Sequence, residues 1–314
     1  MPSNNVYIEI PKSHLIRLKN YISDIWKIDC TISNDYILIK DVDLSSLLKR
    51  IYNDEIKLWR YITRIYPYNS ETKNYEEILT LQFQDKIFRV VGHPKEIEDK
   101  LLDDLDDKYE LNPKTFTHYL STIFLAQNYF YGLYPSHLYY KRPVDSFDPI
   151  SRAYYKIYES ISIFNISIKK DWKVLDIGSS PGGWVQYFRN RVNSIIAVDP
   201  AELKLKDLSG IVHLQKKVEE SLEEIKKYGK YNILTCDMNQ DPREIAQTIN
   251  SLSQFMKSDA ILILTLKMIF KNKQNQESLV NDTVQILSKE IKNMKVKRLF
   301  ANSKYEKQLF GVFL

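Results

Sequence analysis

The second half of this chain of 314 residues contains short apolar runs that alternate with helical stretches, and this alternation most constrains the fold. The apolar runs are KVLDIG (173–178), SIIAVDP (194–200), IVHLQ (211–215), YNILTCDM (231–238) and AILILTLK (260–267). They lack the polar alternation of a half-exposed strand, as is typical of parallel strands covered on both faces. Helical periodicity covers residues 150–164, 182–192, 219–228, 243–256 and 278–293. The sequence therefore predicts a doubly wound, mostly parallel α/β domain, whose ligands bind at the carboxyl ends of the strands.

The stretch VLDIGSSPGGW (174–184) holds three of the eight glycines of the chain. It joins the first apolar run to a predicted helix, so it lies at the ligand-binding edge of the sheet. Gly178 permits a sharp turn, and Gly182 and Gly183 would let a ligand approach the backbone at a helix N-terminus. The stretch matches neither the dinucleotide fingerprint nor the P-loop. The alternative is a tight strand-to-helix turn that binds nothing.

The N-terminal half mixes β-like runs with helical stretches, which indicates α+β structure. We predict a small α+β unit over residues 1–72 and a second α+β region over 73–145. The second region begins with a strand-like stretch, 78–92, and an acidic helix, 94–109. The polar stretch KRPVDSFDP (141–149) contains two prolines and is the predicted linker to the doubly wound domain, 146–314.

Positive charge is concentrated in the C-terminal half of the chain. Residues 1–150 carry 19 Lys and Arg against 22 Asp and Glu, whereas residues 151–314 carry 26 against 18. A net positive domain suits a polyanionic partner such as a nucleic acid.

Several other classes of protein are not expected. No apolar run reaches the length of about 18–20 residues that spans a bilayer, and the first residues lack the pattern of a signal peptide. We therefore expect a protein that stays in the cytoplasm and binds no membrane. Cys30 and Cys236 are far apart, and the histidines never pair at helical spacing, so reduced thiols and no metal site are expected.

Four segments of the second half resemble one family of enzymes. LDIGSSPGGW (175–184) is similar to the cofactor loop of the FtsJ/RrmJ-like ribose 2′-O-methyltransferases, and SRAYYKI (151–157) resembles the helix that precedes their first strand. CDMNQDPREIA (236–246) and LTLKM (264–268) resemble the corresponding segments of the RlmM-type branch. The resemblance implies a Rossmann-like, S-adenosylmethionine-dependent RNA methyltransferase domain.

The resemblance also implies a set of cofactor-binding residues. They are Asp176, Gly178, Ser179, Ser180, Pro181, Gly182, Gly183, Trp184, Asp199 and Asp237. Asp199 has an independent rationale, because an acid at the end of the second strand can accept both ribose hydroxyls of a cofactor. Relatives often carry an acid near the adenine, but this chain has Lys216 and Lys217 there. The backbone of Val218 or the side chain of Glu219 is the alternative adenine contact.

The catalytic set implied by the resemblance is Lys156, Asp237, Lys267 and Glu306. We assign Lys267 as the general base or the group that steers the hydroxyl, and Lys156 as the second cation, which orients the ribose. Asp237 is assigned as the acid that positions both lysine and cofactor. A lysine can accept a proton if burial and a neighbouring cation depress its pKa. Singly, the two lysines could be ordinary surface residues, and Asp237 could simply end a strand. For the last position, the alignment of LFGVFL (309–314) also allows Lys307 or Gln308, and Gln308 would leave the set incomplete.

The expected partner is RNA, either ribosomal or transfer RNA. Residues 73–145 resemble a THUMP domain, an RNA-binding module, behind a ferredoxin-like unit. Candidate RNA contacts are Lys141, Arg142, Arg152, Lys271 and Lys273. The tyrosines near Lys141 could stack on unpaired bases or could simply pack in the core. Two other functions stay open: an inactive RNA-binding or assembly factor that keeps the cofactor fold, and an RNA base methyltransferase.

Overall fold

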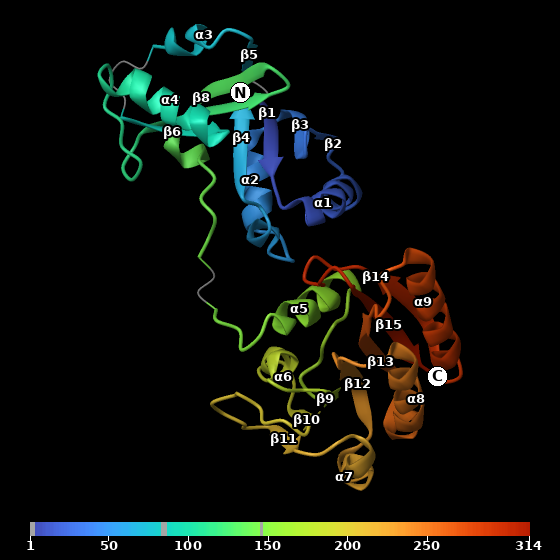
Figure 1. Cartoon of the computed structure of the whole chain (residues 1–314). Coiled ribbons are helices and arrows are strands. Elements are labelled where there is room, and N and C mark those ends of the chain that lie inside the picture. The colour runs from blue at the N-terminus through green and yellow to red at the C-terminus, as the bar shows by residue number, and fades with distance from the viewer. Residues whose placement is uncertain (1–3, 83–86, 145–146) are drawn as a thin grey trace. The chain divides into compact units, whose positions relative to one another are not determined.

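A computed structural model describes residues 4–82, 87–144 and 147–314 (Figure 1). The chain divides into two compact units, Met1–Asp145 and Ser146–Leu314, and each is described here by itself. Residues 145–146 of the predicted linker and 83–86 of the predicted strand-like stretch lie outside the described residues. No helix within the described ranges combines the length and the apolar character needed to cross a bilayer.

The first unit begins with a four-stranded antiparallel sheet in the order β2-β3-β1-β4. Its elements are β1 (Asn4–Glu9), α1 (Leu15–Tyr21), β2 (Thr31–Ser33), β3 (Tyr36–Val42), α2 (Leu44–Tyr52) and β4 (Arg64–Tyr68). Asp43 caps α2, because its carboxylate accepts from the backbone N–H of Ser46 at 2.9 Å. The βαββαβ sequence of elements is the ferredoxin-like arrangement.

A second four-stranded sheet completes the first unit, in the order β5-β8-β7-β6. Its elements are β5 (Ser70–Thr72), α3 (Glu76–Leu79), β6 (Phe88–His93), α4 (Lys95–Asp106), β7 (His118–Leu125) and β8 (Asn128–Pro135). Residues 76–79 are helical, so the strand predicted from residue 78 was wrong at its start. The Asn74 side chain accepts from the N–H of Glu76 at 3.1 Å, and this turn begins the helix.

The second unit is a seven-stranded sheet in the order β11-β10-β9-β12-β13-β15-β14 (Figure 1). Its strands are β9 (Lys173–Ile177), β10 (Ser194–Val198), β11 (Ile211–Leu214), β12 (Tyr231–Cys236), β13 (Met256–Lys267), β14 (Ile291–Lys297) and β15 (Glu306–Phe313). Its helices are α5 (Ala153–Ile163), α6 (Gly183–Phe188), α7 (Leu222–Tyr228), α8 (Pro242–Leu252) and α9 (Lys273–Leu287). The strands β9 to β13 pair in parallel, while β15 runs antiparallel to both of its neighbours.

Helices cover both faces of this sheet, which explains the apolar runs in the sequence. On β9, Leu175 and Ile177 pack in one core with α7, α8 and α9, whereas Val174 packs in another core with α5 and α6. The same alternation holds on β13, where Leu264 faces the first core and Ile263 the second. The middle of each central strand is therefore buried on both faces, and the predicted doubly wound α/β fold is confirmed.

One strand of this sheet was missed in the sequence. Residues 278–293 were predicted as a helix, but α9 ends at Leu287 and β14 begins at Ile291. Lys292, Lys295 and Lys297 give β14 its polar character, which is typical of a strand at the edge of a sheet. Edge strands carry too few apolar residues to stand out by periodicity.

Candidate active site

Polar side chains follow neighbouring strands of the seven-stranded sheet at one edge. Asp199 follows β10, Asp237 follows β12, and Lys267 is the last residue of β13. These parallel strands end at the same edge, so the three side chains are brought together from distant parts of the sequence. The antiparallel strand β15 starts at this edge, where Glu306 pairs in register with Lys267. The reversed direction of β15 thus places a fourth charged residue at the same edge.

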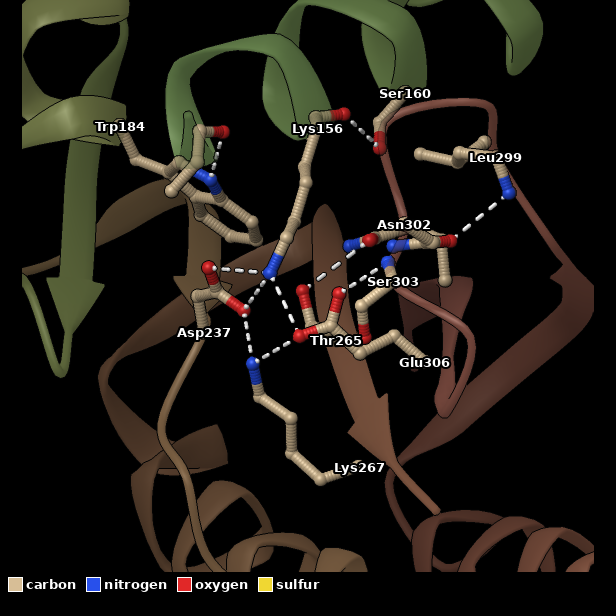
Figure 2. A network of polar contacts seen from close by, with 12 residues as sticks. Lys156, Ser160, Trp184, Asp237, Thr265, Lys267, Leu299, Asn302, Ser303 and Glu306 are labelled. Carbon is tan, nitrogen blue, oxygen red and sulfur yellow. Dashed lines mark hydrogen bonds and ion pairs between the residues drawn. The ribbon is translucent and has the colours of Figure 1, made fainter. Parts of the chain in front are cut away.

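Lys156, Asp237, Lys267 and Glu306 form a closed ring of ion pairs (Figure 2). The Nζ of Lys156 donates to both carboxylate oxygens of Asp237 and to Oε1 of Glu306, each at 3.0 Å. The Nζ of Lys267 donates to Oδ1 of Asp237 and to Oε1 of Glu306, each at 2.8 Å. All four side chains are between 11% and 15% exposed, so the ring is largely shielded from water but accessible.

Register decides which residue of the last strand joins this ring. Lys307 and Gln308, the two alternatives, pair with Leu266 and Thr265 further inside the sheet. Gln308 is fully buried, and its side-chain oxygen accepts from the Thr265 hydroxyl at 3.2 Å. Glu306 is therefore the member of β15 that contacts both lysines, and the set of four charged groups is complete in the structure.

The charges of the ring perturb the pKa values of Glu306 and Lys267. Burial disfavours the charged form of Glu306, but its hydrogen bond with Lys267 and the charge of Lys156 outweigh it and lower its pKa to about 2. Burial likewise disfavours the charged form of Lys267, but Asp237 and Glu306 outweigh it and raise the pKa of that lysine. The depressed pKa that a lysine needs to act as a base is therefore not found at Lys267, because two carboxylates contact the ammonium group. In this state Lys267 is a cation, which favours steering of a hydroxyl over proton abstraction.

Lys156 reaches the ring from α5, which is held against the glycine loop. The indole N–H of Trp184 donates to the carbonyl of Ala153 at 2.8 Å (Figure 2). A Cβ at Gly183 would lie 2.3 Å from the Ser151 hydroxyl and 3.0 Å from the backbone nitrogen of Tyr154. Gly183 is therefore needed for the close approach of the chain around the start of α5. The ligand approach expected at this glycine stays a prediction.

A cavity of about 650 Å³ lies beside the ring, within the usual range for a small-molecule site. Gly178, Ser180, Asp199 and Asp237 contribute to its wall. A smaller cavity shares Gly178, Ser180 and Asp237 with it. The smaller cavity is also lined by Asp176, Ser179, Pro181, Gly183 and Trp184. Apart from Gly182, every predicted cofactor-binding residue thus lines one of these two cavities.

The glycine loop shapes the boundary of these cavities. Gly178 and Gly182 have φ angles of +71° and +112°, a conformation that favours glycine. Asp199 fixes the loop, because its carboxylate accepts from the backbone N–H of Ser180 at 3.0 Å and of Ala201 at 2.8 Å. Both backbone contacts leave the carboxylate on the wall of the larger cavity.

Asp176 is a buried acid with an unfilled acceptor. One oxygen accepts from the Thr235 hydroxyl at 2.6 Å, but the other, Oδ2, has no hydrogen-bond partner among the described residues. The buried hydroxyl of Ser179 lacks a partner in the same set of residues. Burial raises the pKa of Asp176 to about 8, and the nearby charges of Asp237 and Asp199 add to the effect. A ligand in the adjoining cavity would supply the missing partners.

The larger cavity is also lined by the stretch in which the adenine contact is expected. Lys216, Lys217, Val218 and Glu219 all contribute to its wall. Lys216 is engaged elsewhere as well, because its Nζ lies 2.6 Å from a carboxylate oxygen of Glu224. Met238, Asn239 and Gln240 line the cavity too and were not predicted. Their position directly after Asp237 was the signal that could have identified them.

The predicted RNA contacts fall in both units. Arg152, Lys271 and Lys273 are exposed residues of the second unit, and Lys271 and Lys273 follow Lys267 in the sequence. Lys141 and Arg142 are exposed residues of the first unit. The tyrosines near them mostly pack inside that unit: Tyr131, Tyr134 and Tyr140 are each no more than 8% exposed. The structure therefore favours the packing alternative for these three tyrosines.

No group of three or more His, Cys, Asp or Glu side chains is arranged to hold a metal ion in residues 4–82, 87–144 and 147–314. Cys30 and Cys236 are both buried free thiols. Burial raises the pKa of Cys236 to about 12, so it is not a reactive thiolate.

Curated proteins resemble parts of this chain. The uncharacterized protein MJ1257 of Methanocaldococcus jannaschii is 30% identical over 160 residues, which cover 50% of this chain and 45% of that protein. Ribosomal RNA large subunit methyltransferase E of Neorickettsia sennetsu is 37% identical over 81 residues, 25% of this chain and 37% of that protein. These matches span less than half the length of each relative. The branch of the family, which the sequence places nearest the RlmM type, stays a prediction.

The fold of the whole chain also has a counterpart among solved structures. The crystal structure of TrmN from Thermus thermophilus covers 99% of this chain and 100% of its own, with a TM-score of 0.50 and 11% identity. This identity establishes a likeness of fold alone.

The profile of one family matches residues 149–308, slightly more than half of the chain. The matched range contains the whole ring of ion pairs and both cavities. The cofactor of this family is S-adenosylmethionine, and the volume of the larger cavity and the unpaired acceptor of Asp176 fit such a ligand. The chain therefore belongs to the FtsJ-like methyltransferase family.

Proposed function

We propose that the protein is an S-adenosylmethionine-dependent RNA methyltransferase that modifies a ribose 2′-hydroxyl. One observation carries the proposal: Asp237 belongs to the ring of ion pairs and also lines both cavities. A single carboxylate thus joins the binding site for the methyl donor to two lysines that can hold a hydroxyl group. The names of the relatives as ribosomal RNA methyltransferases support this class of reaction.

The cofactor would be held by the cavity walls. Asp199 would accept from its ribose hydroxyls, and the loop 179–183 and Asp176 would contact the rest of it. When bound there, S-adenosylmethionine supplies a methyl group on a sulfonium centre, which needs little further activation.

The ring residues would supply orientation and a path for one proton. The ammonium groups of Lys156 and Lys267 can donate to the hydroxyl oxygen and hold it in line with the methyl group. Methylation of the hydroxyl oxygen would require its proton to leave. The ring contains two carboxylates that can accept it, those of Asp237 and Glu306. Lys267 could serve as the base only after giving up its own proton to one of them.

We propose that RNA reaches this site over the loop that follows Lys267. Ile269 and Phe270 are 50% and 36% exposed, which is unusual for large apolar side chains. Lys271 and Lys273 are exposed beside them. An exposed aromatic ring next to basic groups is suited to stack on an unpaired base while the lysines contact phosphates. Arg152, at the start of α5, would add a further phosphate contact.

The first unit would recruit the RNA. Residues 73–145 are proposed as a THUMP-like module behind the ferredoxin-like unit, with Lys141 and Arg142 as contacts. The substrate would be ribosomal or transfer RNA, encountered in the cytoplasm. No metal ion is required by this scheme.

A transfer assay tests the proposal. The protein is incubated with labelled S-adenosylmethionine and total RNA from the source organism lacking this gene. We expect label in RNA, and a loss of at least about a hundredfold in rate for Lys267→Met, within the usual contribution of groups that handle protons. Lys257→Met is the matched control, because Lys257 is an exposed residue near the other end of the same strand.

The two alternative functions give different results in the same assay. Binding of cofactor and RNA without transfer of label would identify an inactive RNA-binding factor and contradict the proposal. Transfer that persists in the Lys267→Met variant would contradict the assignment of the ring.

A further inference from the structure

One buried carboxylate near the ring is not part of it. Glu159 is 2% exposed and lies on α5, three residues after Lys156. Its Oε1 accepts from the backbone N–H of Phe300 at 2.8 Å, and its Oε2 accepts from that of Ala301 at 2.9 Å. Both oxygens act as acceptors, as expected for an ionised carboxylate. Burial of such a group is costly unless it is satisfied in this way.

The partners of Glu159 belong to an irregular segment, residues 299–303, that leads into β15. Two side-chain acceptors also bind backbone N–H groups of this segment. The N–H of Leu299 donates to the Asn302 side chain at 2.9 Å, and the N–H of Ser303 donates to Oε2 of Glu306 at 2.9 Å (Figure 2). The segment therefore contacts Glu159 through Phe300 and Ala301, and contacts the carboxylate of Glu306 through Ser303.

Helix α5 thus contributes to the ring through two residues, Lys156 and Glu159. It carries Lys156 into the ring directly, and Glu159 on the next turn anchors the backbone that orients Glu306. The two oxygens of Glu306 have different partners: Oε1 accepts from both lysines, and Oε2 from Ser303. A shift of the 299–303 segment would rotate this carboxylate away from the lysines.

We propose that Glu159 is a positioning residue that holds Glu306 in the ring through the 299–303 segment. The catalytic part of this inference rests on the proposed function, because it assumes that the ring performs methyl transfer. The structural part does not, since it concerns the geometry of Glu306 in the ligand-free protein.

The first test uses Glu159→Gln. The amide retains one acceptor but presents N–H groups to a backbone N–H, so the segment must move. We expect kcat to fall about ten- to hundredfold, as for small displacements of reacting groups, while the Kd of S-adenosylmethionine stays unchanged. Thr283→Ala is the control: it removes a buried hydroxyl of α9 that donates to the Leu279 carbonyl at 2.7 Å, and it should leave kcat unchanged.

A double-mutant cycle with Glu306→Gln separates positioning from general destabilisation. If Glu159 acts through Glu306, adding Glu159→Gln to Glu306→Gln should reduce kcat by less than about threefold. A full ten- to hundredfold loss in that background, or an unchanged kcat in the single variant, would overturn the proposal. Should Glu159→Gln fail to fold, Asn302→Ala loosens the same segment without altering a buried charge, and the same cycle applies.

The second test needs no activity. The low pKa of Glu306 means that its contribution to the free energy of unfolding is complete above pH 4.5 and is lost as the pH falls toward 2. This contribution is measured as the difference between wild type and Glu306→Gln at each pH. In the Glu159→Gln background we expect this contribution to be smaller above pH 4.5 and to be completely lost at a higher pH than in the wild type. An unchanged profile would overturn the inference, whereas absent methyl transfer by the wild type would overturn only the proposed function.

Discussion

Asp237 accepts hydrogen bonds from both lysines of the ring and forms part of the wall of both cavities. The ring has two positive and two negative groups, so it is neutral as a whole while each member contacts two opposite charges. Such a cluster is orienting rather than strongly basic, because Asp237 and Glu306 stabilise the cationic form of Lys267. A substrate hydroxyl that binds to the lysines would therefore replace some of the ion-pair contacts within the ring.

Asp176 gives a prediction at the scale of one residue. Its pKa is about 8 in the folded protein and 3.8 in its ordinary state, because burial disfavours the charge. A raised carboxyl pKa means that the unfolded state ionises first, so stability falls as the pH rises from 3.8 toward 8. We expect the ligand-free Asp176→Asn variant to be more stable than wild type at pH 8, with the difference vanishing near pH 4.

Urea unfolding at several pH values measures this difference, and S-adenosylmethionine binding should weaken in the same variant. The comparison variant is Asp259→Asn, which changes an exposed carboxylate of β13 that is paired with Lys292. A stability difference for Asp176→Asn that does not depend on pH would contradict the assigned pKa.

At the scale of the element, the turn from β9 to α6 packs closely against Met238, the residue that follows Asp237. Gly178 has a φ of +71°, and a Cβ there would lie 2.2 Å from Cγ of Met238. Gly178→Ala is expected to destabilise the protein by roughly 1–3 kcal/mol and to weaken cofactor binding, since both strain and a clash follow.

Gly210→Ala is the matched control for this turn. Gly210 has a similar φ of +75°, but it is exposed and a Cβ would lie 3.3 Å from the Asn193 carbonyl. Chemical denaturation of both variants isolates the clash with Met238 from the strain that they share. Equal losses of stability, with cofactor affinity retained in both, would show that the close packing of Gly178 is unimportant.

The central elements could be predicted because β9, β10, β12 and β13 are buried on both faces. Their apolar runs in the sequence indicate this burial directly, and the glycine-rich motif after β9 indicates the turn. The edge strand β14 was missed because it presents lysines to solvent. Glu159 was missed because it accepts from backbone groups of a segment 141 and 142 residues away in the sequence. Such a contact leaves no local pattern, although a carboxylate on a face of α5 that also carries buried residues was a visible signal.

The sequence also could not predict how many carboxylates contact each lysine of the ring. The resemblance indicated which residues meet, but the pKa of Lys267 depends on how many carboxylates contact its ammonium group. That number follows from the antiparallel register of β15 against β13, which sets Glu306 opposite Lys267. A shift of two residues would have placed Gln308 there and removed one charge.

At the scale of the whole molecule, the two units have separate hydrophobic cores. The ring and both cavities belong to the second unit alone. Residues 147–314 expressed by themselves are therefore expected to fold and to bind S-adenosylmethionine with a Kd within about threefold of the full chain, because the binding groups are unchanged. Methyl transfer to RNA should fall much further, since the proposed recruiting residues are removed.

Calorimetric titration with the cofactor and the transfer assay on the same preparations measure these two effects. For each protein, the rate of transfer at limiting RNA is divided by the rate at saturating RNA, and this ratio is compared between the full chain and residues 147–314. If the truncated protein matched the full chain at limiting RNA, the first unit would have no part in recruitment.

The most direct test of the account is the position of the methyl group on the RNA. Labelled RNA from the transfer assay is digested with alkali, which needs a free 2′-hydroxyl to cleave the adjoining phosphodiester. The account predicts label in alkali-resistant dinucleotides, which appear with the wild-type protein and are lost with Lys267→Met. Label in mononucleotides would mean that a base is methylated, and would contradict the assignment of the ring to a ribose hydroxyl.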